Sequence, residues 1–264
     1  MDYLFMNDRR MNQVRRGKVQ SIVKAGLVLL MGAAMTACAA TTWKEEVLLH
    51  DGSKIVVERS VDRGGRHEIG QSPPIREQGL TFSLPANGEG VSWKSEFTAD
   101  IGYANLQPML LDVFQGTAYI VSDTVGCLSY NKWGRPNPPY VVLKYQNKQW
   151  LRVPLEELPA VIKTPNMIFG SPDDAVERAG KRFMSVEMIA EIRERYRQPE
   201  YKTILREPLA PERQCRVEFS NGIGTWLSVD WFRDEKDLSA CVRVCERKGF
   251  NEATCPCGQF FKGN

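Results

Sequence analysis

The chain has 264 residues, with 35 Lys plus Arg, 32 Asp plus Glu and seven Cys. Its apolar content of 42% and its six Trp are enough for a packed core, which excludes a globally disordered chain. The formal charge of +3 arises near the N-terminus, because removing the six basic and two acidic residues of positions 1–37 leaves a net charge of −1. With no basic excess to neutralise phosphates, we expect no nucleic acid as partner.

The N-terminal region combines a basic segment with a short apolar run from Ala25 to Ala37. This run is too short to span a bilayer, which takes about 20 apolar residues. A basic segment, a short apolar core and small residues at the exit are typical of a secretory signal peptide, which we place at residues 1–37. The basic segment is long enough for translation to begin at either Met1 or Met11.

The end of this signal is more specific. The sequence Met35-Thr36-Ala37-Cys38 resembles a bacterial lipobox, with Met in place of the usual first Leu. The resemblance implies cleavage before Cys38, lipid on its sulfur, acylation of the freed amine and attachment to a membrane through this lipid anchor. Ala39 at the next position favours the outer membrane. The alternative is an ordinary signal peptide with an incidental Cys.

Two stretches of the mature chain, "LLHDGSKIVVERSVDRGGRHEIGQ" and "YNKWGRPNPPYV", are similar to segments of uncharacterised hypothetical lipoproteins of Gram-negative bacteria. This resemblance implies a location in the bacterial cell envelope. It implies no activity.

Residues 38–165 read as an antiparallel β domain. Apolar runs rich in β-branched residues flank turn residues four times. The pairs are "EEVLLH" with "KIVVERSV", "LTFSL" with "VSWKSEF", "MLLDVF" with "TAYIVSD", and "YVVLKY" with "QWLRVPL". This spacing predicts a mainly β fold, an antiparallel meander folded as a sandwich or a barrel.

The rest of the chain predicts three further parts. Residues 166–198 form a helical segment, with one short helix after Ser171 and a second that is capped by Ser185 and ended by Pro199. Residues 199–233 contain a strand pair around Asn221-Gly222 that we expect to complete the β domain. Residues 234–264 form a Cys-rich tail, of which "DLSACVRVCERKGF" looks helical.

Six cysteines remain once Cys38 is assigned to the lipid, and an even number behind a secretion signal indicates three disulfides. Fifteen pairings exist, but Cys255-Pro-Cys257 is too tight for an internal bridge. Cys241 and Cys245 share a helix face, so we expect them to pair with Cys255 and Cys257, nested or crossed. Elimination then pairs Cys127 with Cys215. Zinc on the four tail thiolates is the alternative, but their spacing is unusual and the compartment oxidising, so we expect no metal and no cofactor.

Candidate binding residues lie in two polar loops. In the 62–78 loop, Arg66, His67 and Glu68 suggest either an acid–base pair or a solvated loop without function. In "CLSYNKWGRPNPPY", Tyr130, Trp133 and Arg135 suit a peptide or a glycan, although a loop sealed by its own aromatics and held by a cystine is favoured.

The other histidine, His50, lies at a predicted hairpin turn and is expected to be solvated. No known catalytic motif stands out. Three hypotheses remain: a non-enzymatic, membrane-anchored protein that binds an envelope protein or glycan, a periplasmic enzyme that uses the 62–78 loop, and an immunity protein against an envelope-targeted toxin.

Overall fold

The structure is a computed structural model that describes residues 40–95 and 97–261. The predicted signal peptide and the lipobox up to Cys38 therefore lie outside the described residues. The chain divides into two units, Met1–Ala39 and Ala40–Asn264, and the second contains every described residue. Among these residues, no helix is long and apolar enough to cross a membrane.

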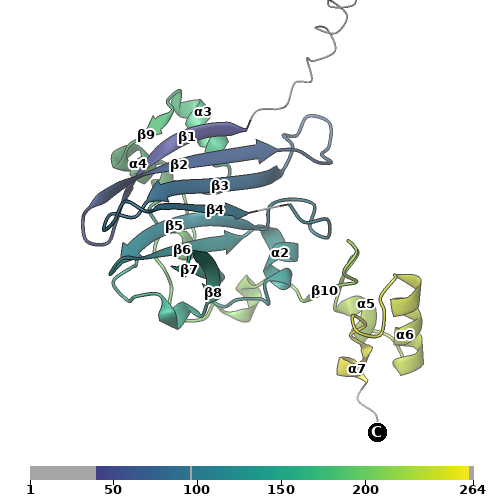
Figure 1. Cartoon of the computed structure of the whole chain (residues 1–264). Helices are drawn as coiled ribbons and strands as arrows, with labels where there is room; N and C mark the ends of the chain where they lie inside the picture. Colours follow the sequence, from purple (N-terminus) through teal and green to yellow (C-terminus); the bar gives the residue numbers. More distant parts are fainter. Residues whose placement is uncertain (1–39, 96, 262–264) are drawn as a thin grey trace, which may run out of the picture. The chain divides into compact units, whose positions relative to one another are not determined.

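Two β-sheets form the body of this unit, and the mainly β, antiparallel fold is as predicted (Figure 1). The first has the strand order β4-β3-β2-β1-β9, antiparallel except that β9 runs parallel to β1. The second has the order β5-β6-β7-β8 and is antiparallel throughout. The strands are β1 Thr41–Leu48, β2 Lys54–Arg63, β3 Ile75–Ser83, β4 Gly90–Ser95, β5 Leu106–Phe114, β6 Thr117–Thr124, β7 Tyr140–Gln146, β8 Gln149–Val153 and β9 Phe183–Met184.

The four predicted hairpins all form, because their turns have the residues that the backbone needs. The β1–β2 turn has Gly52 at φ +85°, a conformation that costs glycine little. Asp51 Oδ1 accepts hydrogen bonds from the Ser53 backbone N–H at 2.9 Å and from its hydroxyl at 2.6 Å. Gly116 at φ +78° closes β5–β6 in the same way. Turn chemistry therefore helps to set the register of these two pairs.

The two sheets pack face to face, which makes the fold a sandwich. One apolar cluster contains inward side chains of both sheets, including Val57 and Leu80 from the first and Leu111 and Ile120 from the second. Along β2 the buried and exposed residues alternate, as expected for a strand with one face in the core. The alternation of apolar and polar residues that predicted this strand therefore also gives it the apolar face that packs in the sandwich.

Strands β5 and β6 of the second sheet are buried on both faces. On the outer face of this sheet, Met109, Leu110 and Tyr119 pack under the segments after β8, including Ile162 and Ile204. This explains why the strands β5 and β6 read as nearly continuous apolar runs and do not alternate.

Two helices cover the first sheet at the β1 and β9 end (Figure 1). They are α3 Pro172–Ala179 and α4 Val186–Glu194, within the predicted helical segment. The Ser185 hydroxyl caps α4 by accepting the Met188 backbone N–H at 3.4 Å, but the Ser171 side chain makes no such bond at α3. Helix α4 ends at Glu194, before Pro199. The 3-10 turns are η1 Leu155–Glu157, η2 Pro199–Tyr201 and η3 Pro211–Arg213.

The C-terminal part differs from the prediction in one respect. The pair around Asn221 forms, as β10 Glu218–Ser220 and β11 Trp226–Ser228, but it is a separate two-stranded sheet and does not join either larger sheet. The apolar side chains of β10 and β11 pack instead with the tail, in a cluster centred on Phe232 and the cystines. The tail helices are α5 Asp230–Arg233, α6 Leu238–Arg247 and α7 Cys257–Phe260.

Three disulfides hold the chain as predicted. Cys127 is joined to Cys215, across a sequence separation of 88 residues. In the tail, Cys241 is joined to Cys257 and Cys245 to Cys255, so these two bridges are nested.

Candidate functional site

A groove of about 690 Å³ runs along the edge strand β4, and we call it the tryptophan groove. Strands β3 and β4 of the first sheet, the end of α2 (Gly126–Lys132) and Trp150 of β8 line it. Its volume falls within the range of ligand sites in proteins, about 300–1,000 Å³. The lining includes three charged side chains, three tryptophans and two of the small residues: Glu77, Lys94, Lys132, Trp93, Trp133, Trp150, Gly79 and Ser92.

Of the three tryptophans, Trp93 is buried, whereas Trp133 and Trp150 are half-buried and held in place. Trp150 Nε1 donates a hydrogen bond to the Ser92 backbone oxygen at 2.7 Å, which ties β8 to the edge of the opposite sheet. Trp133 packs under the Arg152 guanidinium, which lies 5.5 Å from the ring centroid. Both rings also contact the sandwich core. They are therefore rigid aromatic surfaces, which lose little conformational entropy on binding.

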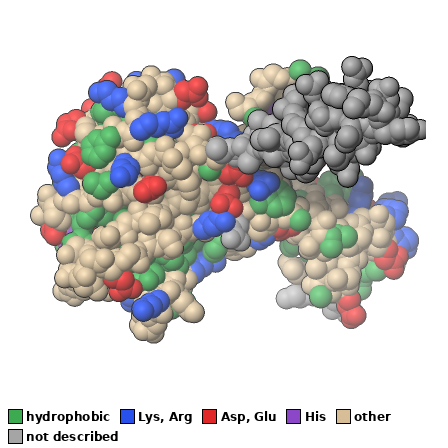
Figure 2. All heavy atoms as spheres, turned by 45° about the horizontal axis from the view of Figure 1, so that its top comes forward, with side chains coloured by type: hydrophobic (Ala, Val, Ile, Leu, Met, Phe, Trp, Pro, Cys, Tyr) green, Lys and Arg blue, Asp and Glu red, His purple; other side chains and the backbone are tan. Residues whose placement is uncertain are grey.

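The charged side chains of the groove are paired within the protein. Lys94 Nζ lies 2.7 Å from Glu77 Oε2, and Lys132 Nζ lies 2.7 Å from Asp100 Oδ1. Figure 2 shows that basic and acidic side chains are also mixed over the face of the molecule that it displays. The groove therefore has no net charge of either sign to select a charged ligand.

A glycine also lines the groove. Gly79 lies on the outward side of β3, and a Cβ added there would lie 2.7 Å from Ser60 Oγ. A side chain at this position would therefore displace Ser60.

The structure separates the three aromatic-loop candidates. The sequence suggested that their segment is a loop, but its first part forms the helix α2. Trp133 lines the tryptophan groove, whereas Tyr130 is buried and faces a different hollow. Arg135 lies 5.2 Å from the Tyr130 ring centroid and donates to the Arg216 backbone oxygen at 2.9 Å. Of the three, Trp133 alone lines this groove.

The 62–78 segment does not bring its candidates together. Strand β2 extends to Arg63 and β3 begins at Ile75, which leaves a loop of residues 64–74. Arg66, His67 and Glu68 are exposed on it, and His67 Nδ1 lies 3.0 Å from the Gly65 backbone oxygen. The tryptophan groove is lined by other residues.

His50 is an exposed residue of the β1–β2 turn, as expected, but its side chain is largely covered and paired. Its Nδ1 lies 2.7 Å from Asp112 Oδ1, and its side chain is 17% exposed. Asp112, on β5, also accepts the backbone N–H groups of His50 at 2.9 Å and Val113 at 2.7 Å. The β1–β2 turn is thus held against the second sheet, and the pair faces a cavity of about 390 Å³.

A smaller hollow of about 200 Å³ lies beside the Cys127–Cys215 bridge and contains Asp123. Burial raises the pKa of the Asp123 carboxyl group to about 7, and the nearby Glu200 carboxylate adds to the rise. Glu200 is held by Arg213, whose Nη2 lies 2.9 and 2.7 Å from its two carboxylate oxygens. Burial also raises the pKa of Tyr140 to about 12. The hollow therefore contains one carboxyl group whose pKa is raised to about 7.

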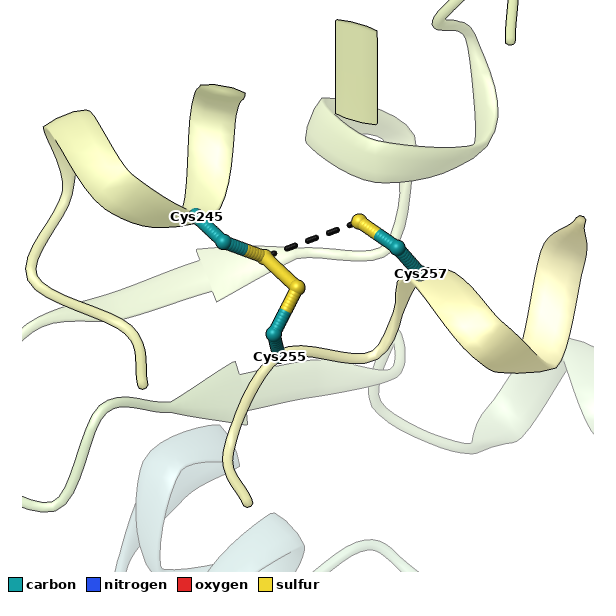
Figure 3. A group of neighbouring side chains, drawn as sticks. All are labelled: Cys245, Cys255 and Cys257. Carbon is teal, nitrogen blue, oxygen red and sulfur yellow. Dashed lines mark hydrogen bonds between the residues drawn. A yellow bond between two sulfur atoms is a disulfide. The ribbon is translucent and has the colours of Figure 1, made fainter. Parts of the chain in front are cut away.

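The tail cysteines could be read as a metal site, because the sulfurs of Cys245, Cys255 and Cys257 lie within 4.8 Å of one another (Figure 3). The Cys245 and Cys257 sulfurs are 3.6 Å apart. However, each of these sulfurs belongs to a disulfide. Zinc binds thiolates, so this oxidised cluster offers it no ligand.

Sequence reasoning missed the His50–Asp112 pair, the Asp123 hollow and the role of Trp150. His50 and Asp112 are 62 positions apart, and no local pattern links them. Comparisons with protein-family models, with curated proteins and with solved structures find no match.

Proposed function

We propose that this chain is a lipid-anchored protein of a bacterial envelope that binds a neutral glycan in the tryptophan groove. The anchor rests on the lipobox resemblance of Met35 to Cys38. The ligand class rests on one observation, which is that rigid indole rings line a groove whose charged side chains are already paired.

Aromatic rings and paired charges suit a sugar for separate reasons. The C–H face of a pyranose ring is apolar, and it packs on an aromatic surface such as that of Trp133 or Trp150. A sugar hydroxyl both donates and accepts, so it can bridge a Lys94 ammonium and a Glu77 carboxylate without disturbing their charge balance. A charged peptide or a nucleic acid would gain no such complementarity here.

A direct test is titration of the full chain, isolated with its anchor in nonionic detergent, with the tetramer of N-acetylglucosamine. This probe is neutral and N-acetylated. Calorimetry should detect saturable binding. Trp133→Ala should weaken it by about tenfold or more, because a buried aromatic contact often accounts for that much affinity.

Two matched controls separate binding from folding. Trp231→Ala removes a tail tryptophan that is 50% exposed and should leave affinity unchanged. Ser92→Trp should block the groove from an exposed position of β4, whereas Val56→Trp adds the same bulk to an exposed position of β2 outside it. The proposal fails if the tetramer does not bind, or if Ser92→Trp binds as well as Val56→Trp.

A further inference from the structure

The cavity beside His50 has the features of a second ligand site. It is lined by the β1–β2 turn, by Asp112 of β5, by residues 161–166 and by one face of α4. Its volume of about 390 Å³ falls within the range of small-molecule sites. It shares no lining residue with the tryptophan groove.

Asp112 fixes the orientation of the His50 ring. Both Asp112 carboxylate oxygens contact His50. Oδ2 accepts the His50 backbone N–H at 2.9 Å, and Oδ1 lies 2.7 Å from the ring nitrogen Nδ1. Phe114 packs against the imidazole, with the ring centroids 5.4 Å apart. With Nδ1 occupied by the carboxylate, Nε2 is the ring atom left for a ligand.

The charges of the lining favour an anion. Glu46 is already paired, because its Oε2 lies 3.0 Å from Lys54 Nζ, and Asp112 is paired with His50. Among the described residues, Lys163 and Arg193 have no carboxylate partner, and the buried Nε of Arg193 has no hydrogen-bond partner. Arg193 donates only from Nη2, to the Tyr201 backbone oxygen at 3.1 Å. The cationic groups are therefore in excess.

The remaining wall is apolar. Leu49, Pro165 and Ile189 are buried in it, and Leu48 and Val161 are 40% and 53% exposed. Exposed aliphatic side chains beside unpaired cations suit a molecule with an acidic head and an apolar body.

We propose that this cavity binds a small organic carboxylate with an apolar body, with the carboxylate at His50, Lys163 and Arg193. Because Nδ1–H is committed to Asp112, Nε2 donates only when the ring is protonated. The ligand carboxylate therefore favours the imidazolium, which then donates to two carboxylates. The titratable and charged groups that line the cavity are Glu46 from β1, Asp112 from β5, Lys163 from the 161–166 segment and Arg193 from α4.

The test uses the full chain in nonionic detergent with three probes: hexanoate, hexan-1-ol and inorganic phosphate. Hexanoate should bind at least tenfold more tightly than either of the others, because only hexanoate has both the charge and the apolar body. Its affinity should increase as the pH falls from 8 to 6. The chain has two His, so proton NMR can assign the site, and the His50 ring signals should shift while those of His67 stay unchanged.

Substitutions of His50 and Lys163 test the charged groups of the cavity. His50→Asn should abolish the preference for hexanoate over hexan-1-ol. Lys163→Gln, at an exposed side chain, should weaken hexanoate several-fold without affecting the fold, and Lys236→Gln in the tail is its matched control. Equal binding of hexanoate and hexan-1-ol would overturn the proposal. So would unshifted His50 signals, a shift in His67 as large as that in His50, or equal affinities of the two Lys variants.

Discussion

Arg59 and Glu45 form an ion pair inside the sandwich, on the adjacent strands β2 and β1. Arg59 Nη1 lies 2.9 Å from Glu45 Oε1, and the two side chains are 1% and 0% exposed. Trp43 Nε1 donates to the same carboxylate oxygen at 2.9 Å, and Arg59 also donates to the Ile168 backbone oxygen. The pair thus joins the first sheet to the segment that precedes α3.

This pair predicts an asymmetric response to mutation. Glu45→Gln leaves a buried guanidinium without its counter-ion, which should lower the free energy of unfolding by about 3–5 kcal/mol. The double variant Glu45→Leu with Arg59→Met removes both charges and should recover most of that loss, since buried pairs add little net stability. Urea unfolding of both variants measures these free energies of unfolding. A single variant within about 1 kcal/mol of the parent would contradict the prediction.

The Asp123 carboxyl predicts a pH dependence of stability. Its folded pKa is about 7 against an ordinary value of 3.8, so between these pH values the folded state binds more protons than the unfolded state. Stability from this group is therefore highest at low pH and falls as pH rises towards 7. Asp123→Asn mimics the protonated form and should remove this loss.

Asp123→Asn and the parent should differ in stability at high pH only. At pH 8, Asp123→Asn should be more stable than the parent, by on the order of 2 kcal/mol after allowance for solvent screening. At pH 4 the two should unfold alike. Thermal unfolding at both pH values measures this. Glu200→Gln is not an equivalent control, because Arg213 holds that carboxylate in an ion pair. Equal stabilities at pH 8 would show that Asp123 is ionised at little cost.

The nested disulfides predict that the tail loosens independently of the sandwich. The tail cluster is small, with Phe232, Val244 and Phe250 as its buried apolar side chains beside the cystines. Such a core does not offset the ordering entropy of the segment without cross-links. Replacing both Cys241 and Cys257 by Ser should destabilise the tail by about 2–4 kcal/mol.

Hydrogen exchange locates this effect. Amide protection should fall in α6 and stay unchanged in β5, because none of the described tail residues belongs to the sandwich core. Replacing Cys127 and Cys215 is the matched comparison, since that bridge ties α2 to the segment before β10 and should affect the sandwich side. Loss of protection in β5 of the tail variant would show that the tail and the sandwich unfold as one.

Local patterns predicted the elements whose signals are local. Asp51-Gly52 between two alternating runs specified the first hairpin. Arg59 on β2 is in phase with the buried Val57. A charged residue at such an inward position is a signal for a buried pair that sequence reasoning did not use. Its partner was equally in phase, since Glu45 alternates with Val47 on β1.

Contacts between distant segments left no such signal. Strand β9 has two residues and exists because Phe183 and Met184 pair with β1, about 140 positions earlier in the chain. The tryptophan groove requires Trp133 and Trp150 to meet the edge of a strand from the other sheet. The sequence therefore indicated Trp133 as an aromatic candidate. It could not show which charged side chains pair beside Trp133, because that depends on the tertiary structure.

The proposed lipid anchor can be tested at Cys38. If Met35-Thr36-Ala37-Cys38 acts as a lipobox, then cells given labelled palmitate should label this chain, and Cys38→Ser should abolish the label together with the processing before position 38. Several acyl chains anchor stably because each buried CH₂ contributes about 0.8 kcal/mol, so the unlabelled variant should also leave the membrane fraction. Met35→Leu is the matched control, because it restores the usual first residue and should preserve labelling. Palmitate label that persists in Cys38→Ser would remove the anchor, and the glycan proposal would then stand on the tryptophan groove alone.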